Sequence, residues 1–273
     1  MEVVSASTLI SPRFAAWLRD AVLRDPATHT YLLYDLVYEP ENTVAKIVLE
    51  GLEVLGYVLE WCRGSLCAIH VWGRVPRELV EEFLTTLSAR RLYVHVHEPS
   101  LEEEVSRIVE RAWGGGRCWS SRFVDMVVNR ELFKPFSERV SAVVRLLDSR
   151  RDLDQFVEMK RVQGRAMTRS EAESWLSTRV YVGAFVNGVL ASMAGAVARV
   201  RDAWIVADVF TRPEHRGKGF ATAVTSELTR LGLDSGVKWL ALHVEEGNRI
   251  AMRIYEKLGY RRVRSKLWIM CEK

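Results

Sequence analysis

The chain has 273 residues, of which 48% are hydrophobic and 27% charged, and it carries a formal net charge of +4 at pH 7. This composition excludes an intrinsically disordered chain, and the length suffices for two domains of ordinary size. No uninterrupted apolar run approaches 18 residues and no signal-type segment is present, which excludes a helical membrane protein and predicts a cytoplasmic one.

The charge is divided unevenly along the chain. Residues 1–130 hold 14 Lys and Arg against 18 Asp and Glu, whereas residues 131–273 hold 25 against 17. A basic C-terminal half suits an anionic ligand. Nucleic acid is disfavoured as that ligand, because no strand interleaves aromatic with basic residues.

The four cysteines, Cys62, Cys67, Cys118 and Cys271, show neither a C-x-x-C pair nor a metal-like spacing with histidine. We therefore expect buried thiols and no metal site. There are only two glutamines and four asparagines, and arginine outnumbers lysine 31 to 8. The scarcity of thermolabile amides predicts a heat-adapted protein, although genome composition also explains an arginine excess.

Hydrophobic periodicity in the N-terminal half predicts alternating helices and strands. The expected helices cover residues 12–24, 30–38, 76–88 and 101–113, and the expected strands cover 45–50, 54–60, 66–71, 92–96 and 122–129. The charged connection that follows contains Pro135 and is the expected linker.

Hydrophobic periodicity in the C-terminal half also predicts both strands and helices, with three strands in succession near its middle. The expected strands cover 140–147, 180–186, 189–200, 204–211, 239–244 and about 262–270, and the expected helices cover 152–162, 170–176, a segment from Phe220 onward, and 248–258. Ser170, with Glu173 three residues on, is the expected cap of the second helix. Asn187-Gly188 predicts a hairpin turn.

A glycine-containing loop joins the strand at 204–211 to the next helix. It consists of Arg216, Gly217, Lys218, Gly219, Phe220, Ala221 and Thr222. A helix start presents unpaired N–H groups and a partial positive charge, and glycines let an anion approach the backbone. The loop lacks both the Gly-Lys-Ser/Thr ending of a P-loop and the three glycines of a dinucleotide fingerprint. It predicts a diphosphate site, and the alternative is a helix start that binds nothing.

A second motif runs from residue 242 to residue 260. Asn248 is suited to cap a helix and Gly259 to end it, with Ala251, Tyr255 and Tyr260 at set distances from them. This motif, and the pattern Arg-x-x-Gly-x-Ala in the loop about 30 residues before it, resemble the two signatures of the GNAT acetyltransferase superfamily.

The resemblance covers about residues 138–273. It implies an α/β (α+β) GNAT fold, with a mixed central sheet flanked by helices, and it implies acetyl-CoA as co-substrate and a primary amine as acceptor. In the family the fourth and fifth strands splay apart and the pantetheine arm lies between them. The residues that this implies for coenzyme A are the main chain of Val209, Phe210 and Thr211, the loop 216–222, Asn248 and Tyr255.

Direct attack of an amine on the thioester needs positioning and two proton transfers. Tyr255 matches the family tyrosine near the sulfur and is the expected donor to the leaving thiolate, although its place on an apolar helix face also suits a core residue. The candidates for the base are Asp208, His243 and Glu245. Burial in an apolar strand would raise the pKa of Asp208. A chain of waters is the alternative base, since such residues are often only hydrogen-bonded or solvent-facing.

The N-terminal half has a GNAT-like order of elements, but its turn at 70–77 lacks the Arg-x-x-Gly-x-Gly/Ala pattern. We therefore expect a degenerate GNAT-like domain without a coenzyme A loop at 1–130, a linker at 131–139 and a catalytic GNAT domain at 140–273. The arrangement and the segments Asp25-Pro26, Tyr31-Leu32-Leu33 and Asp35-Leu36 resemble two-domain, glycine N-acyltransferase-type proteins.

The function that the sequence predicts is transfer of an acetyl group from acetyl-CoA to a primary amine in a ternary complex. Small-molecule and protein amines both stay open as acceptors, and the oligomeric state is not predicted. A catalytically silent acetyl-CoA sensor and a nucleic-acid module that uses the basic half are the alternatives.

Overall fold

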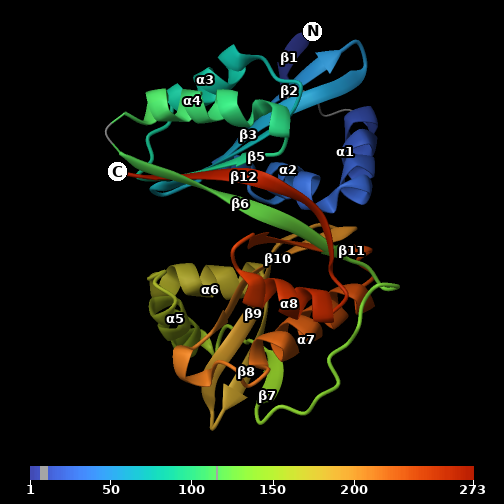
Figure 1. Cartoon of the computed structure of the whole chain (residues 1–273), viewed down its shortest axis with the longest axis vertical. Coiled ribbons are helices and arrows are strands. Elements are labelled where there is room, and N and C mark those ends of the chain that lie inside the picture. Colours follow the sequence, from blue (N-terminus) through green and yellow to red (C-terminus); the bar gives the residue numbers. More distant parts are fainter. Residues whose placement is uncertain (7–11, 115) are drawn as a thin grey trace. The chain divides into compact units, whose positions relative to one another are not determined.

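The computed structural model describes residues 1–6, 12–114 and 116–273. The chain divides into two compact units, which we call the N-terminal and the C-terminal unit (Figure 1). The N-terminal unit comprises Met1–Asp125, Glu245–Gly247 and Arg264–Lys273, and the C-terminal unit comprises Met126–Val244 and Asn248–Val263.

The N-terminal unit is a sheet with helices on both faces. Its elements are β1 (Glu2–Ser5), α1 (Pro12–Arg24), α2 (Pro26–Tyr38), η2 (Pro40–Asn42), β2 (Thr43–Glu50), β3 (Glu53–Arg63), β4 (Leu66–Gly73), α3 (Arg77–Thr85), β5 (Arg91–Val96), η3 (Pro99–Leu101), α4 (Glu102–Trp113) and most of β6 (Arg117–Val128) and β12 (Arg261–Glu272). The strand order is β1-β2-β3-β4-β5-β12-β6.

Alternation along the strands divides the N-terminal unit into two cores. On β3, Val58 packs in one core with residues of α3 and α4, such as Phe83 and Val109. Its neighbours Tyr57 and Leu59 belong to the other core, which includes residues of α1 and α2. β4 and β5 are parallel and stay paired from Leu66 opposite Arg91 to Val71 opposite Val96.

The last strand of the chain belongs to the N-terminal unit, whereas the sequence placed all of 140–273 in one domain. Leu267–Glu272 of β12 pair antiparallel with β5. The expected linker also differs, because residues 131–139 lie in the C-terminal unit. There the N–H of Lys134 donates to the carbonyl of Leu258, and the N–H of Phe136 donates to Ser226 Oγ. Strand pairing and these bonds are non-local, so local composition did not reveal them.

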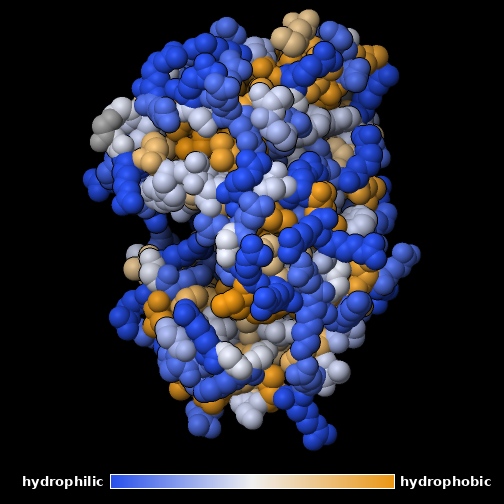
Figure 2. All heavy atoms as spheres, viewed as in Figure 1, coloured by the Kyte–Doolittle hydropathy of each residue, from blue (hydrophilic) through white to orange (hydrophobic). Residues whose placement is uncertain are grey.

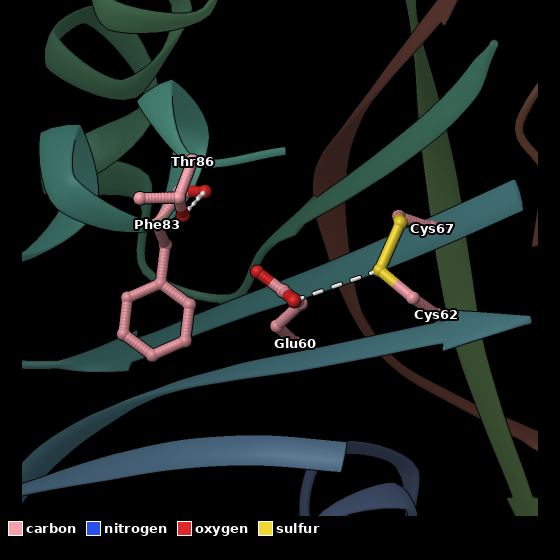
Figure 3. The surroundings of a disulfide bond; sticks show 5 residues. All are labelled: Glu60, Cys62, Cys67, Phe83 and Thr86. Carbon is pink, nitrogen blue, oxygen red and sulfur yellow. Dashed lines mark hydrogen bonds between the residues drawn. A yellow bond between two sulfur atoms is a disulfide. The ribbon is translucent and has the colours of Figure 1, made fainter. Parts of the chain in front are cut away.

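The four cysteines form two disulfides, so the expectation of buried thiols is wrong. Cys62 of β3 bonds Cys67 of β4, which lies directly opposite it, and Cys118 of β6 bonds Cys271 of β12. Figure 3 shows Glu60 pointing toward the first bridge, with its carboxylate 3.6 Å from the sulfur of Cys62. Both bridges tie neighbouring strands of the N-terminal unit.

The C-terminal unit is a second mixed sheet with its own helices. Its elements are β7 (Val143–Leu146), α5 (Leu153–Val162), α6 (Arg169–Thr178), β8 (Val180–Val186), β9 (Val189–Arg199), β10 (Ala203–Thr211), η4 (Pro213–His215), α7 (Phe220–Asp234), most of β11 (Trp239–Glu245) and α8 (Arg249–Lys257). The strand order is β11-β10-β9-β8-β7, with β10 and β11 parallel and the other pairs antiparallel.

The core of this unit follows the same alternation. Tyr181 and Phe185 of β8 pack with residues of α5 and α6, such as Phe156 and Leu176. The hairpin between β8 and β9 is confirmed, because Asn187 and Gly188 both have positive φ, at 48° and 80°. The cap of α6 differs from the prediction: it is Thr168, which forms a capping box with Glu171.

The surface offers no large apolar face in the view of Figure 2. Hydrophobic residues there lie in small patches between hydrophilic ones. Over residues 1–6, 12–114 and 116–273, no helix has the length and apolar character needed to cross a membrane.

Candidate active site

β10 and β11 separate partway along their length. Their pairing runs from Ala203 opposite Trp239 to Val206 opposite Leu242, although β10 continues to Thr211 and β11 to Glu245. On its other edge β10 stays paired with β9, with Phe210 opposite Met193. The edge of Val209, Phe210 and Thr211 that faces β11 therefore has no ladder partner within the described residues. This is the splayed geometry that the resemblance implied.

The loop after β10 has the backbone of an anion cradle. Gly217 and Gly219 have positive φ of 76° and 77°, which side chains disfavour, and a Cβ at Gly217 would meet nothing within 4 Å. α7 begins at Phe220 with Gly219 as its N-cap, and no side chain caps the helix. Phe220 and Thr222 are buried and Ala221 is half-buried. Hence no side chain occupies the N–H groups of the first turn, and the diphosphate site there stays a prediction.

The two cations of the loop are exposed. Arg216 Nε lies 3.4 Å from the carbonyl oxygen of Thr211, and Lys218 Nζ donates to the carbonyl of Glu214 at 3.1 Å. Neither forms an ion pair within the described residues. Both charges are therefore available to an anion at the start of α7.

α8 is fixed at both ends by the residues that the sequence singled out. The Asn248 side chain accepts a hydrogen bond from the N–H of Ala251 at 3.1 Å, so it caps the helix. Gly259 has a φ of 90°, and a Cβ there would lie 1.9 Å from the carbonyl oxygen of Leu132. The helix start and stop are confirmed.

Tyr255 is buried on α8, and its burial raises its pKa to about 12. Its ring lies 5.9 Å from that of Tyr260, whose hydroxyl is 2.8 Å from Thr229 Oγ1 on α7. The phenol is thus protonated at neutral pH and packs beside the helix that the loop opens. It can donate a proton but it cannot accept one.

Asp208 lies where β10 bulges. Ala207 is opposite Gly195 and Phe210 is opposite Met193, so β10 has one residue more than β9 over this step, and Asp208 has a φ of 54°. Its buried carboxylate accepts hydrogen bonds from Lys160 Nζ at 2.6 Å, Tyr181 Oη at 2.8 Å and Arg165 at 2.9 Å.

These partners overturn the expected direction of the Asp208 pKa. Burial alone raises the pKa of this carboxyl, but Lys160 and Arg165 more than offset burial and hold the pKa below its usual value. Asp208 is therefore an ion-paired carboxylate at neutral pH, which makes it a poor proton acceptor.

The other two candidates for the base lie on β11. His243 is half-buried and is the first residue after Leu242, where the pairing with β10 ends. Glu245 is exposed and accepts a hydrogen bond from Ser121 at 2.6 Å. Of the three, His243 lies nearest along its strand to the point where β10 and β11 separate.

Sequence reasoning missed Lys160, Tyr181 and Arg165. A signal for Lys160 was present, because it lies four residues after Phe156 and seven after Leu153, on the apolar stripe of α5. A lysine on such a stripe needs a buried partner. That this partner is Asp208 of β10 can be known only from the fold.

Comparisons with known proteins agree with this geometry. Residues 149–260, which include α5 to α8, match the model of the Acetyltransferase (GNAT) family. A 52-residue segment is 35% identical to thialysine N-ε-acetyltransferase of Bos taurus, and it covers 19% of this chain and 31% of that enzyme. The chain thus spans about a third of the length of this curated relative.

Solved structures resemble the whole chain. A Drosophila protein is 12% identical with a TM-score of 0.74, and the match covers 96% of each chain. A tandem GNAT protein from the clavulanic acid biosynthesis pathway is also 12% identical, with a TM-score of 0.61 and coverage of 99% of this chain and 98% of its own.

The fold is therefore the mixed α/β GNAT fold, and the tandem relative supports an arrangement of two domains. Residues 149–260 are thus similar to the GNAT acetyltransferase family, whose members use acetyl-CoA, and the likeness to the solved structures concerns the fold. The resemblance to glycine N-acyltransferase-type proteins stays a prediction.

Proposed function

We propose that this protein transfers an acetyl group from acetyl-CoA to a primary amine. The observation that carries the proposal is the separation of β10 from β11 beyond Val206 and Leu242, which leads into an uncapped helix start with two positive-φ glycines. An open strand edge suits the amides of pantetheine, and the helix start suits a pyrophosphate.

The proposed reaction is direct attack by the neutral amine, with both reactants held at the gap between the strands. Tyr255 donates the proton to the leaving thiolate, because its hydroxyl carries a proton at neutral pH. His243 accepts the proton of the incoming ammonium, since it lies at the gap and Asp208 is held in ion pairs.

We propose one acetyl-CoA site per chain. In the N-terminal unit, the parallel pair β4 and β5 stays closed for six residue pairs, and the N–H of His97 extends it by donating to the carbonyl of Val71. α3 there starts after Pro76, and the turn before it has the single glycine Gly73 in place of the two glycines that precede α7. Among its described residues, the N-terminal unit therefore has neither a gap between these parallel strands nor a cradle for coenzyme A.

The test is release of coenzyme A thiol from acetyl-CoA with a panel of amines: lysine and thialysine, other amino acids, polyamines, and peptides with a free α-amine or lysine. We expect thiol release and acetylated product, by mass spectrometry, with at least one class. Gly219→Asp is the control, because it places bulk and negative charge in the cradle and should abolish both binding and release.

Calorimetry with coenzyme A separates the alternatives. Binding without release for any amine would replace the enzyme with an acetyl-CoA sensor. Absence of binding to the intact protein would contradict both readings, and salt-sensitive binding of nucleic acid that saturating coenzyme A does not affect would favour a nucleic-acid module.

A further inference from the structure

The backbone at Asp208 is in a conformation that its own side chain disfavours. A φ of 54° places Cβ close to the carbonyl oxygen, and a residue other than glycine keeps this conformation only where surrounding contacts hold it. Asp208 lies two residues beyond Val206, where β10 stops pairing with β11. The strained residue and the opening of the gap therefore coincide.

The contacts that hold Asp208 come from separate elements. Lys160 lies on α5, Tyr181 on β8 and Arg165 after α5. The side chains of Lys160 and Asp208 are 1% and 3% exposed, whereas that of Arg165 is 62% exposed. The two buried donors are thus fixed by the core, and the exposed arginine is the weakest of the three supports.

The ammonium of Lys160 is itself held in place. Its Nζ lies 4.9 Å from the ring centre of Trp175, 5.4 Å from that of Phe156 and 5.7 Å from that of Tyr181. Aromatic faces attract a cation, so the three rings fix the position of the Lys160 ammonium. The position of the ammonium in turn fixes that of the Asp208 carboxylate. The core of the unit thus positions Lys160, and Lys160 positions the bulge of β10.

We infer that Lys160 and Tyr181 are positioning residues that, through Asp208, hold β10 in the bulged path that keeps the acetyl-CoA gap open. The inference rests on the proposed function, since it concerns the same gap. In this role Asp208 maintains the shape of the acetyl-CoA site and does not transfer a proton.

The location of the network favours this role over one in stability alone. A buried ion pair is weak evidence for stability, because apolar residues of similar volume often stabilise a core as well or better. Here the pair acts on the single residue of β10 with positive φ, at the bulge. Its loss is expected to let β10 relax toward a regular path and narrow the gap.

The experiment measures the affinity of the full-length protein for coenzyme A by calorimetry. Lys160→Met removes the charge and shortens the unbranched side chain by only one heavy atom, and we expect it to weaken binding by about tenfold or more. Arg161→Met is the matched control, because Arg161 is the next residue of α5 and pairs with Glu158 at the surface. It should bind as the wild type does.

A rescue distinguishes the shape of β10 from general destabilisation. Glycine adopts positive φ without strain, and Asp208→Gly also removes the buried carboxylate that Lys160→Met leaves short of a partner. The double variant Lys160→Met/Asp208→Gly should therefore bind coenzyme A within about threefold of the wild type. Tyr181→Phe, which removes one hydroxyl and leaves the ring, gives a second test, with an expected loss of about threefold.

Two results would overturn the inference while the proposed function stands. One is wild-type affinity in Lys160→Met and Tyr181→Phe. The other is a double variant that, with the near-ultraviolet circular dichroism of the wild type, binds no better than Lys160→Met. If the wild type itself fails to bind coenzyme A, the proposed function fails and the inference falls with it.

Discussion

Tyr255 and His29 are buried aromatic side chains whose pKa values burial moves in opposite directions. Burial disfavours the charged form of each, so it raises the pKa of the phenol to about 12 and lowers that of the imidazole to about 4. Both residues are neutral at pH 7. For Tyr255 the consequence is a retained proton, and for His29 it is a stability that depends on pH.

Tyr255→Phe should lower kcat by about 100-fold or more, because the leaving thiolate loses its proton donor. The affinity for coenzyme A should change less than twofold, since the ring and its packing are kept. Steady-state kinetics and calorimetry measure the two quantities.

Tyr260→Phe is the matched control, because it removes a neighbouring hydroxyl that bonds Thr229. It should reduce stability and leave kcat close to that of the wild type. Equal losses of kcat and affinity in Tyr255→Phe would contradict its role as the acid.

The N-terminal unit should lose stability as the pH falls from 6.5 toward 4. Burial is the main cause of the lowered His29 pKa, with Asp25 opposing it and Arg264 and Lys266 adding to it. The unfolded histidine takes up a proton near pH 6.5 while the folded one resists, so about 2.5 kcal/mol of stability is lost by pH 4.5. Urea unfolding followed by tryptophan fluorescence reports this, since His29 lies against Trp72, with ring centres 4.6 Å apart.

His29→Gln, which does not titrate, should flatten this part of the pH profile. A variant that keeps the full slope between pH 6.5 and 4.5 would show that other groups cause it.

At the scale of single elements, local rules explain what the sequence predicted and where it failed. The cap at Asn248 and the stop at Gly259 depend on residues next to α8, and the structure confirms them. The cap of α6 was placed two residues late because Thr168 and Ser170 are each followed by a glutamate after three residues. The sequence alone does not choose between two valid capping boxes.

The missed features all join elements that are distant in the chain. Lys160 and Asp208 are 48 residues apart, and Cys118 and Cys271 are 153 apart. Their contacts depend on strand order and register, which hydrophobic periodicity does not supply. The loop before α7 was predictable, because its two positive-φ glycines and the helix start lie in one contiguous backbone segment.

Two glycines that end helices give a matched test of packing. Gly236 and Gly259 have φ of 93° and 90°, but a Cβ at Gly236 would meet nothing within 4 Å, whereas one at Gly259 would overlap Leu132. Gly236→Ala should cost about 1 to 2 kcal/mol from the backbone alone. Gly259→Ala should cost at least about 2 kcal/mol more, because the connecting segment must move. Thermal unfolding of both variants measures the difference, and equal melting temperatures would contradict it.

At the scale of the whole molecule, the two disulfides lie on one row of the N-terminal sheet. Cys62 is opposite Cys67, Cys67 is opposite Leu92, and Leu92 is opposite Cys271, which bonds Cys118. The row thus crosses five strands. The bridges fasten the sheet across its strands, including the strand that the end of the sequence contributes.

The two bridges should differ in how much they stabilise the protein. Their sequence separations are 5 and 153 residues, and the chain-entropy estimate gives about 2 kcal/mol for the short loop and about 5 kcal/mol for the long one. Replacing Cys118 and Cys271 by serine should therefore lower the denaturation midpoint more than replacing Cys62 and Cys67. A larger drop in the midpoint for the Cys62 and Cys67 variant would show that the disulfides do not stabilise the protein mainly by restricting the unfolded chain.

The position of β12 has a consequence for how the protein is made. Because β12 lies between β5 and β6, the sheet of the N-terminal unit stays incomplete until residues up to 272 have been synthesised. The C-terminal unit needs nothing beyond Val263. During translation, the N-terminal unit is thus the last to acquire all its strands. This reverses the usual order, in which the N-terminal domain of a chain is completed first.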